Sequence, residues 1–171
     1  RPGRVEWFRV TPFLLLHAAC LLVFVVGWSW VAVAVAFAIY FARIFGVTAF
    51  YHRYFSHRAF KTSRTVQFLG AMLGNAAGQR GPIWWAAHHR HHHQASDDPD
   101  DVHSPMQQGF LWSHMLWFMT RDNYRTDERV VKDWLKYPEL RFIERFDFLV
   151  PALLAVSMFA LGECLRMVWP E

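Results

Sequence analysis

The stretch that decides the fold is residues 31–57, VAVAVAFAIYFARIFGVTAFYHRYFSH. Its first part, Val31 to Phe41, is wholly apolar or aromatic, and its end carries two histidines, His52 and His57. A helix needs about 20 mostly apolar residues to cross the hydrocarbon core of a bilayer. We therefore predict a membrane-spanning helix over about residues 30–50 that brings two histidines to one membrane surface.

Two further stretches of the chain are also strongly apolar. Residues 11–28 contain one strongly polar side chain, His17, and residues 148–168 carry charge only at Glu163 and Arg166. Each stretch alone would fit a buried core helix, but three of them in 171 residues, with 54% of the chain hydrophobic, argue against a soluble protein. The sequence predicts an all-α integral membrane helical bundle. The predicted spans are about 11–28, 30–50 and 147–168.

The basic residues indicate how the spans are oriented. Arginines precede the first span, and a larger group lies at or after the end of the second. The rule that cytoplasmic loops are rich in Lys and Arg then places the N-terminus and residues 52–146 in the cytoplasm. The net charge of +4 fits basic side chains that meet anionic lipid head groups, and nothing indicates nucleic acid as a partner. The basic residues are Arg1, Arg4, Arg9, Arg43, Arg53, Arg58, Lys61 and Arg64.

The region between the second and third spans is polar but contains helical patterns. Residues 66–77 are apolar yet too short to cross a bilayer, so we expect a helix that lies against the membrane surface. Gly78, Gly81 and Pro82 interrupt this pattern, and a second helix is expected over residues 83–94. Residues 126–136 have the pattern of a third, amphipathic helix.

A second histidine cluster, residues 88–93 (HHRHHH), lies in the expected helix 83–94. The two clusters together hold seven of the ten histidines. Imidazole is the commonest metal ligand near neutral pH, and ligation by nitrogen suits iron or zinc. Residues three and four apart share a helix face. Two sets satisfy that spacing, and spacing alone leaves both open: His89, His92 and His93, or His88, His91 and His92.

The first cluster, His52 and His57, joins the same site only if the chain brings residues five apart together. We expect this to happen through a helix that ends between them. A solvated or pH-sensitive histidine tract is the alternative for each cluster alone. Two clusters on one side of the membrane favour a shared metal site. Cys20 and Cys164 fall inside predicted spans and are expected to be buried apolar residues, not ligands.

These motifs resemble those of a known family. Residues 46–61, GVTAFYHRYFSHRAFK, resemble the first histidine box of membrane fatty acid desaturases, and residues 85–93, WAAHHRHHH, resemble the second box, W-x-x-x-H-R-x-H-H. Residues 109–117, GFLWSHMLW, look like the segment that follows in acyl-CoA Δ9 desaturases. Residues 79–85, QRGPIWW, look closest to the bacterial branch. The resemblance covers most of residues 40–120.

The resemblance implies a non-haem centre of two iron ions in a bacterial plasma membrane protein. Such enzymes use O2 and two electrons from a small donor, of the ferredoxin or cytochrome b5 type, to place a cis double bond in a fatty acyl chain. The expected position is Δ9, and the carrier is CoA, a carrier protein or an intact lipid. No catalytic residue is expected beyond the metal ligands. The implied iron ligands are His52, His57, His89, His92 and His93.

Two alternatives to desaturation stay open. The same di-iron chemistry also serves fatty acid and alkane hydroxylases, which insert oxygen instead of removing a second hydrogen. A non-catalytic, histidine-rich membrane protein that binds metal is the alternative from a different class. A transporter would place ionisable residues within the spans. The histidines here gather at the ends of spans, which favours the enzyme.

The resemblance also implies missing parts and further partners. The family carries a third box, H-x-x-H-H, and this sequence has no histidine after His114. We therefore expect residues 1–171 to be a partial desaturase domain that is inactive by itself, with ligands beyond Glu171. His103 and His114 are candidate partners that orient the ligand rings. In the acidic loop 96–104, Asp98, Asp100 or Asp101 is expected to do the same, unless this loop is only a solvated turn.

Overall fold

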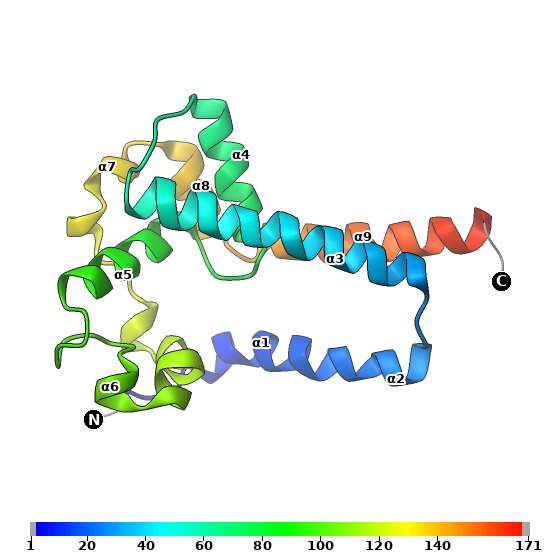
Figure 1. The fold of residues 1–171 in the computed structure, drawn as a ribbon, viewed down its shortest axis with the longest axis horizontal. Helices are drawn as coiled ribbons and strands as arrows, with labels where there is room; N and C mark the ends of the chain where they lie inside the picture. The colour runs from blue at the N-terminus through cyan, green and yellow to red at the C-terminus, as the bar shows by residue number, and fades with distance from the viewer. Residues whose placement is uncertain (1–2, 169–171) are drawn as a thin grey trace.

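The computed structural model describes residues 3–168, so Arg1 and the final residues 169–171 lie outside the described part. Residues 3–168 form helices and turns without a β-strand, apart from one isolated bridge between Val5 and Thr120. Three long helices extend side by side from a polar region built of shorter helices (Figure 1). The expected all-α architecture is therefore confirmed.

The three long helices are the predicted spans. The first combines α1 (Trp7–Ala19), a 3-10 turn and α2 (Val23–Val26), the second begins with α3 (Trp30–Phe45), and the third is α9 (Leu149–Val168). By length and composition, three helices could cross a membrane: Trp7–Val26, Trp30–Ser56 and Leu149–Val168. The first begins earlier than predicted, and the second continues past residue 50.

The turn between the first two spans follows from its sequence. Gly27 has a φ of +78°, which a residue with a side chain rarely adopts, and it ends α2. Ser29 then caps α3, because its Oγ accepts a hydrogen bond from the backbone N–H of Ala32 at 3.1 Å. A short turn therefore joins the two spans.

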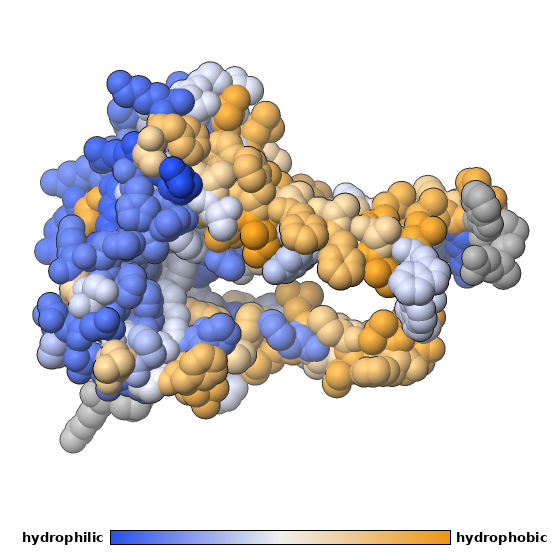
Figure 2. Space-filling model, viewed as in Figure 1, coloured by the Kyte–Doolittle hydropathy of each residue, from blue (hydrophilic) through white to orange (hydrophobic). Residues whose placement is uncertain are grey.

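Apolar side chains cover the outside of the spans. Phe24 and Phe159 are 85% and 71% exposed, and such positions recur along all three helices. Figure 2 shows the apolar surface over the spans and the hydrophilic surface over the polar region. Such a continuous apolar surface is far larger than a soluble monomer exposes. A bilayer provides the environment that these side chains require.

The polar region packs around the end of the second span. There the helix continues as a π-helix, Gly46–Ser56, whose Tyr51 and Phe55 are fully buried. The core around them includes Ile83, Trp134 and Leu140. The remaining helices are α4 (Arg64–Asn75), α5 (Pro82–Gln94), α6 (Pro105–Gln108), α7 (Lys132–Leu135) and α8 (Pro138–Arg145).

Helix α4 and the second span approach each other through glycines. A Cβ atom on Gly46 would lie 2.7 Å from the backbone nitrogen of Gly74. Gly74 and Gly70 in turn make room for the rings of Tyr51 and Phe50. Small residues allow helices in membranes to pack closely, so α4 is fixed against the π-helix. Helix α4, Arg64–Asn75, confirms the helix expected at residues 66–77.

The predicted amphipathic helix over residues 126–136 is wrong as a continuous element. A 3-10 turn, Glu128–Val130, comes first, and α7 begins only after Val131, whose φ of −129° and ψ of 23° are not helical. The carbonyl oxygen of Val130 accepts a hydrogen bond from Arg90 at 2.6 Å. The Val130 carbonyl oxygen thus accepts a hydrogen bond from a distant side chain, whereas in a continuous helix it would accept one from a backbone N–H group.

Helix α5 begins at a buried carboxylate. Oε2 of Glu144, in α8, accepts hydrogen bonds from the backbone N–H groups of Ile83 and Trp84, both at 3.0 Å. Its Oε1 accepts a bond from the Thr126 hydroxyl at 3.1 Å. The first N–H groups of a helix have no partner within the helix, and Gly81 at the N-cap has no side chain to offer. Glu144 therefore fixes where the helix with the second histidine cluster begins.

Replacement of Glu144 by alanine should lower the thermal unfolding midpoint in detergent, because each buried N–H left without a partner costs roughly 1–3 kcal/mol. Burial raises the pKa of Glu144, and this outweighs the lowering by the Trp84 N–H and Arg80. Folding thus favours protonated Glu144. The stabilisation that this protonation contributes is complete below the pKa of Glu144 in the unfolded chain, and it is lost as the pH rises through the pKa in the folded chain.

Glu144→Gln should therefore keep the midpoint at neutral pH and weaken its pH dependence, because the amide oxygen still accepts from both N–H groups. Exposed Glu128, replaced by alanine, is the matched control. Equal midpoints for Glu144→Ala and Glu128→Ala would show that the carboxylate does not hold α5.

Candidate metal centre

Four of the five predicted ligands converge at the end of the second span. The Nε2 atom of His57 lies 3.1 Å from Nε2 of His52 and 3.1 Å from Nε2 of His89. Nε2 of His93 lies 3.0 Å from Nε2 of His89. One ring nitrogen from each of the four lies within 4.8 Å of the others. We call these residues the four-histidine site.

The π-helix explains how His52 and His57 meet. In an α-helix, residues five apart would point roughly 140° away from each other. A π-helix bonds residue i to residue i+5, and the His57 N–H indeed donates to the carbonyl oxygen of His52 at 3.1 Å. The wider turn places both rings on one face. The helix ends at Ser56, so the expectation that it ends between these residues is confirmed, and the unexpected feature is that its last turns are of the π type.

Helix α5 supplies the other two rings from one face. His89 and His93 are one helical turn apart, and the Trp85 ring one turn earlier stacks on His89 at 4.7 Å between centroids. His88 points elsewhere: its Nε2 lies 3.3 Å from the carbonyl oxygen of Arg125. Of the two sets that spacing left open, the structure brings the one containing His89 and His93 to the first cluster.

His92 lies in a neighbouring group rather than in the four-histidine site. Its Nδ1 lies 2.8 Å from Oδ2 of Asp101, and its ring centroid lies 4.3 Å from that of His103. One nitrogen or oxygen atom from each of these three residues lies within 4.8 Å of the others. The ring centroids of His92 and His89 are 6.3 Å apart, so the two groups are adjacent.

Protonation of three rings of the four-histidine site, those of His52, His89 and His93, is unfavourable. Burial, together with the nearby rings of His52 and His93, lowers the pKa of His89 to about 3. Burial and His57 also lower the pKa of His93. The rings of His89 and His93 are therefore held neutral at physiological pH, and one ring nitrogen from each of the four residues approaches a common point. Such a donor set fits a transition metal that prefers imidazole, including iron, zinc or copper.

Asp101 is the residue of the acidic loop that contacts a predicted ligand. Its side chain is completely buried, and it accepts N–H bonds from Asp97 and His103, both at 3.2 Å. Burial raises the pKa of Asp101, but the bonds from His92 and from these N–H groups outweigh it, and the net pKa is lowered. The ionised carboxylate fixes Nδ1 of His92 as a donor and leaves Nε2 free for a metal.

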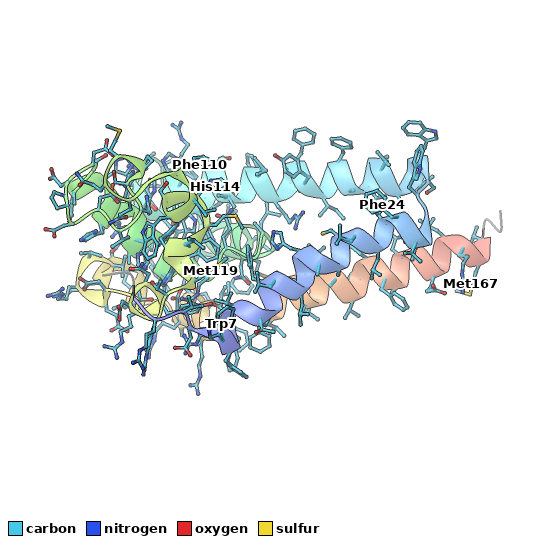
Figure 3. All side chains as sticks on the ribbon, turned by 90° about the horizontal axis from the view of Figure 1, so that it is seen from below. Trp7, Phe24, Phe110, His114, Met119 and Met167 are labelled. Atoms are coloured by element: carbon cyan, nitrogen blue, oxygen red, sulfur yellow. The ribbon has the colours of Figure 1, made fainter. Side chains whose placement is uncertain are left out.

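Of the other candidates, Asp98 and Asp100 are exposed. His103 contacts the ring of His92, as noted above. His114 stacks on Phe110 with 5.3 Å between the ring centroids, and Figure 3 labels both residues. Among the described residues, it belongs to neither histidine group.

Replacement of Asp101 by asparagine should weaken metal binding roughly 10- to 100-fold, the usual cost of losing the partner of a ligand ring. Titration of the purified chain in detergent with Co²⁺, followed by visible absorption, measures this affinity. Asp98→Asn, in the same loop but exposed, should leave the affinity unchanged. Equal affinities for both variants would count against the role of Asp101.

Comparison with known proteins shows the family to which this chain belongs. Residues 7–169 match the profile of the fatty acid desaturase family. The sn-1 stearoyl-lipid 9-desaturase of Anabaena variabilis is 32% identical, covering 97% of this chain and 62% of its own length. A chloroplastic palmitoyl-monogalactosyldiacylglycerol delta-7 desaturase of Arabidopsis thaliana is 37% identical over 82% of this chain and 39% of its own length.

An acyl-CoA 5-desaturase of Anemone leveillei is 34% identical over 90% of this chain and 49% of its own length. The chain thus spans about half the length of the curated relatives it matches. The match runs through all three spans and both histidine clusters. The chain belongs to the fatty acid desaturase family.

Proposed function

We propose that the protein containing this chain introduces a cis double bond into a fatty acyl chain with O2 at a centre of two iron ions. The observation that carries the proposal is the four-histidine site at the end of a membrane span. Its imidazoles converge from two segments. Membership of the desaturase family, through residues 7–169, supports the same reaction.

Five histidines would hold the iron. The four-histidine site offers Nε2 atoms, and His92 offers Nε2 from the adjacent group while Asp101 holds its Nδ1. When bound, the iron would supply the activation of O2, which side chains cannot provide for attack on an unactivated C–H bond. The chain's own contribution is to hold the rings in position, with Trp85 packed on His89.

The substrate we propose is a lipid-linked or CoA-linked acyl chain, with Δ9 as the position of the double bond. Related proteins from Anabaena and Nostoc are named as stearoyl-lipid and palmitoyl-lipid 9-desaturases, and those from Anemone as acyl-CoA desaturases. A small electron donor of the ferredoxin or cytochrome b5 type would supply two electrons. The basic residues favour a site on the cytoplasmic side of a bacterial plasma membrane.

The test is to express the full-length protein in a bacterium that does not make the product and to analyse its fatty acids by mass spectrometry. We expect a cis alkene that requires O2 and disappears in His57→Ala but not in His114→Ala. A hydroxylated acyl chain would support the hydroxylase instead. A purified protein with zinc alone and no product of either kind would refute both enzymes.

A further inference from the structure

Arg90 lies next to His89 on α5 and uses every N–H group of its guanidinium. Nε donates to the carbonyl oxygen of Ser56 at 3.1 Å, and Nη2 donates to that of Phe55 at 2.6 Å. Nη1 donates to the carbonyl oxygen of Val130 at 2.6 Å. The other two N–H groups bind one carboxylate. Only 14% of the side chain is exposed.

The carboxylate is that of Asp133. Its Oδ1 lies 2.9 Å from Nη1 of Arg90 and its Oδ2 lies 3.0 Å from Nη2, so the pair is bidentate. Arg58 contacts the same Oδ2 at 2.7 Å from the exposed side. A guanidinium with all five donors satisfied has one orientation, because rotation would break several bonds at once.

Two of the three carbonyl groups that Arg90 binds, those of Phe55 and Ser56, belong to the residues just before His57. They lie at the end of the π-helix, where the last carbonyl groups of a helix have no partner within the helix. The indole N–H of Trp134 donates to the Phe55 carbonyl as well, at 2.8 Å. Side chains from α5 and α7 therefore cap the end of the π-helix.

We propose that Arg90, held by Asp133, is a positioning residue that sets His57 against His89 in the metal centre. The same residue follows one ligand along α5 and binds the carbonyl groups that precede the other. A shift of the π-helix end would move His57 away from His89, whose Nε2 atoms are 3.1 Å apart. Lysine cannot replace this function, because it has three donors on a point charge and no planar fork.

This inference rests on the proposed metal centre, and Co²⁺ binding to the purified chain in detergent tests it. Arg90→Lys and Asp133→Asn should weaken Co²⁺ binding roughly tenfold or more and alter the visible absorption spectrum. Arg64→Lys is the matched control. Arg64 forms an equally bidentate pair with Glu139, at 2.7 and 2.8 Å, between α4 and α8. Its affinity and spectrum should match those of the wild type.

Each outcome has a separate meaning. Failure of the wild-type chain to bind Co²⁺ through histidine would remove the metal centre itself. A wild-type affinity and spectrum in Arg90→Lys, even with a lowered unfolding temperature, would leave Arg90 a structural role and overturn the positioning role. If Arg90→Lys does not fold, Asp133→Asn decides, because it weakens the bidentate pair that holds Arg90 and leaves Arg90 itself in place. An unchanged spectrum and affinity in that variant would also overturn it.

Discussion

Replacement of His89 by alanine is expected to abolish metal binding at physiological metal concentrations. Nε2 of His89 lies within 3.1 Å of the same atom in His57 and in His93, and its ring centroid lies 4.7 Å from that of His52. Its loss removes a ligand at the middle of the site. The cost should exceed the roughly 10- to 100-fold typical of losing a ligand's hydrogen-bond partner. Co²⁺ titration in detergent measures it.

His88→Ala is the matched control, because His88 is adjacent in sequence and also partly buried but bonds the Arg125 carbonyl instead. Its metal affinity should stay within a few-fold of wild type. Because folding lowers the pKa of His89 to about 3, it disfavours the protonated ring, and the metal-free His89→Ala chain should lose less stability than the wild type as the pH falls below the unfolded-state pKa of histidine. Metal loss in His88→Ala with retention in His89→Ala would mean that the other helical register binds.

Hydropathy predicted the spans because a helix in a bilayer needs no particular partner. Every position in about 20 residues faces lipid or another apolar helix, so composition alone carries the signal. The ends of the spans were less certain. The first begins at Trp7, where the aromatic and apolar side chains start, and the second runs through Ser56 because its polar end packs inside the protein.

The sequence spacing of the histidines predicted which side chains come together better in the second cluster than in the first. His89 and His93 share a face of an ordinary α-helix, and the structure places them together. The π-helix that joins His52 and His57 was not predicted, because the choice between i+4 and i+5 bonding leaves no hydrophobic period to detect. Two of its residues, Tyr51 and Phe55, lie in the buried core, where tertiary contacts that spacing does not reveal surround them.

No local sequence pattern marks the acidic residues that hold α5. Asp133 meets Arg90 across 43 positions, and Glu144 meets the Trp84 N–H across 60. Each looks locally like an ordinary charged residue of a polar surface. Their roles arise from tertiary packing, which one sequence does not encode in any local pattern. The contact between Asp101 and a histidine was easier to predict from the sequence, because Asp101 lies in an acidic loop directly after the second histidine cluster.

Gly46→Leu should destabilise the protein and disturb the metal site together. A Cβ atom at Gly46 would lie 2.7 Å from the Gly74 nitrogen and from the Leu73 carbonyl carbon. These are backbone atoms, so no side chain can rotate away, and α4 must move. Overpacking typically costs about 1–3 kcal/mol. Thermal unfolding and Co²⁺ titration of the same detergent sample should both show a loss.

The control is Gly162→Leu in α9, where no atom of the described residues lies within 4 Å of the added Cβ. This substitution also improves helix propensity, so its unfolding midpoint should not fall. An unchanged midpoint in Gly46→Leu would show that the second span and α4 are not packed through their glycines. A lowered midpoint with full Co²⁺ affinity would separate that packing from the site. Loss of both is expected, because Gly46 begins the π-helix that carries His52 and His57.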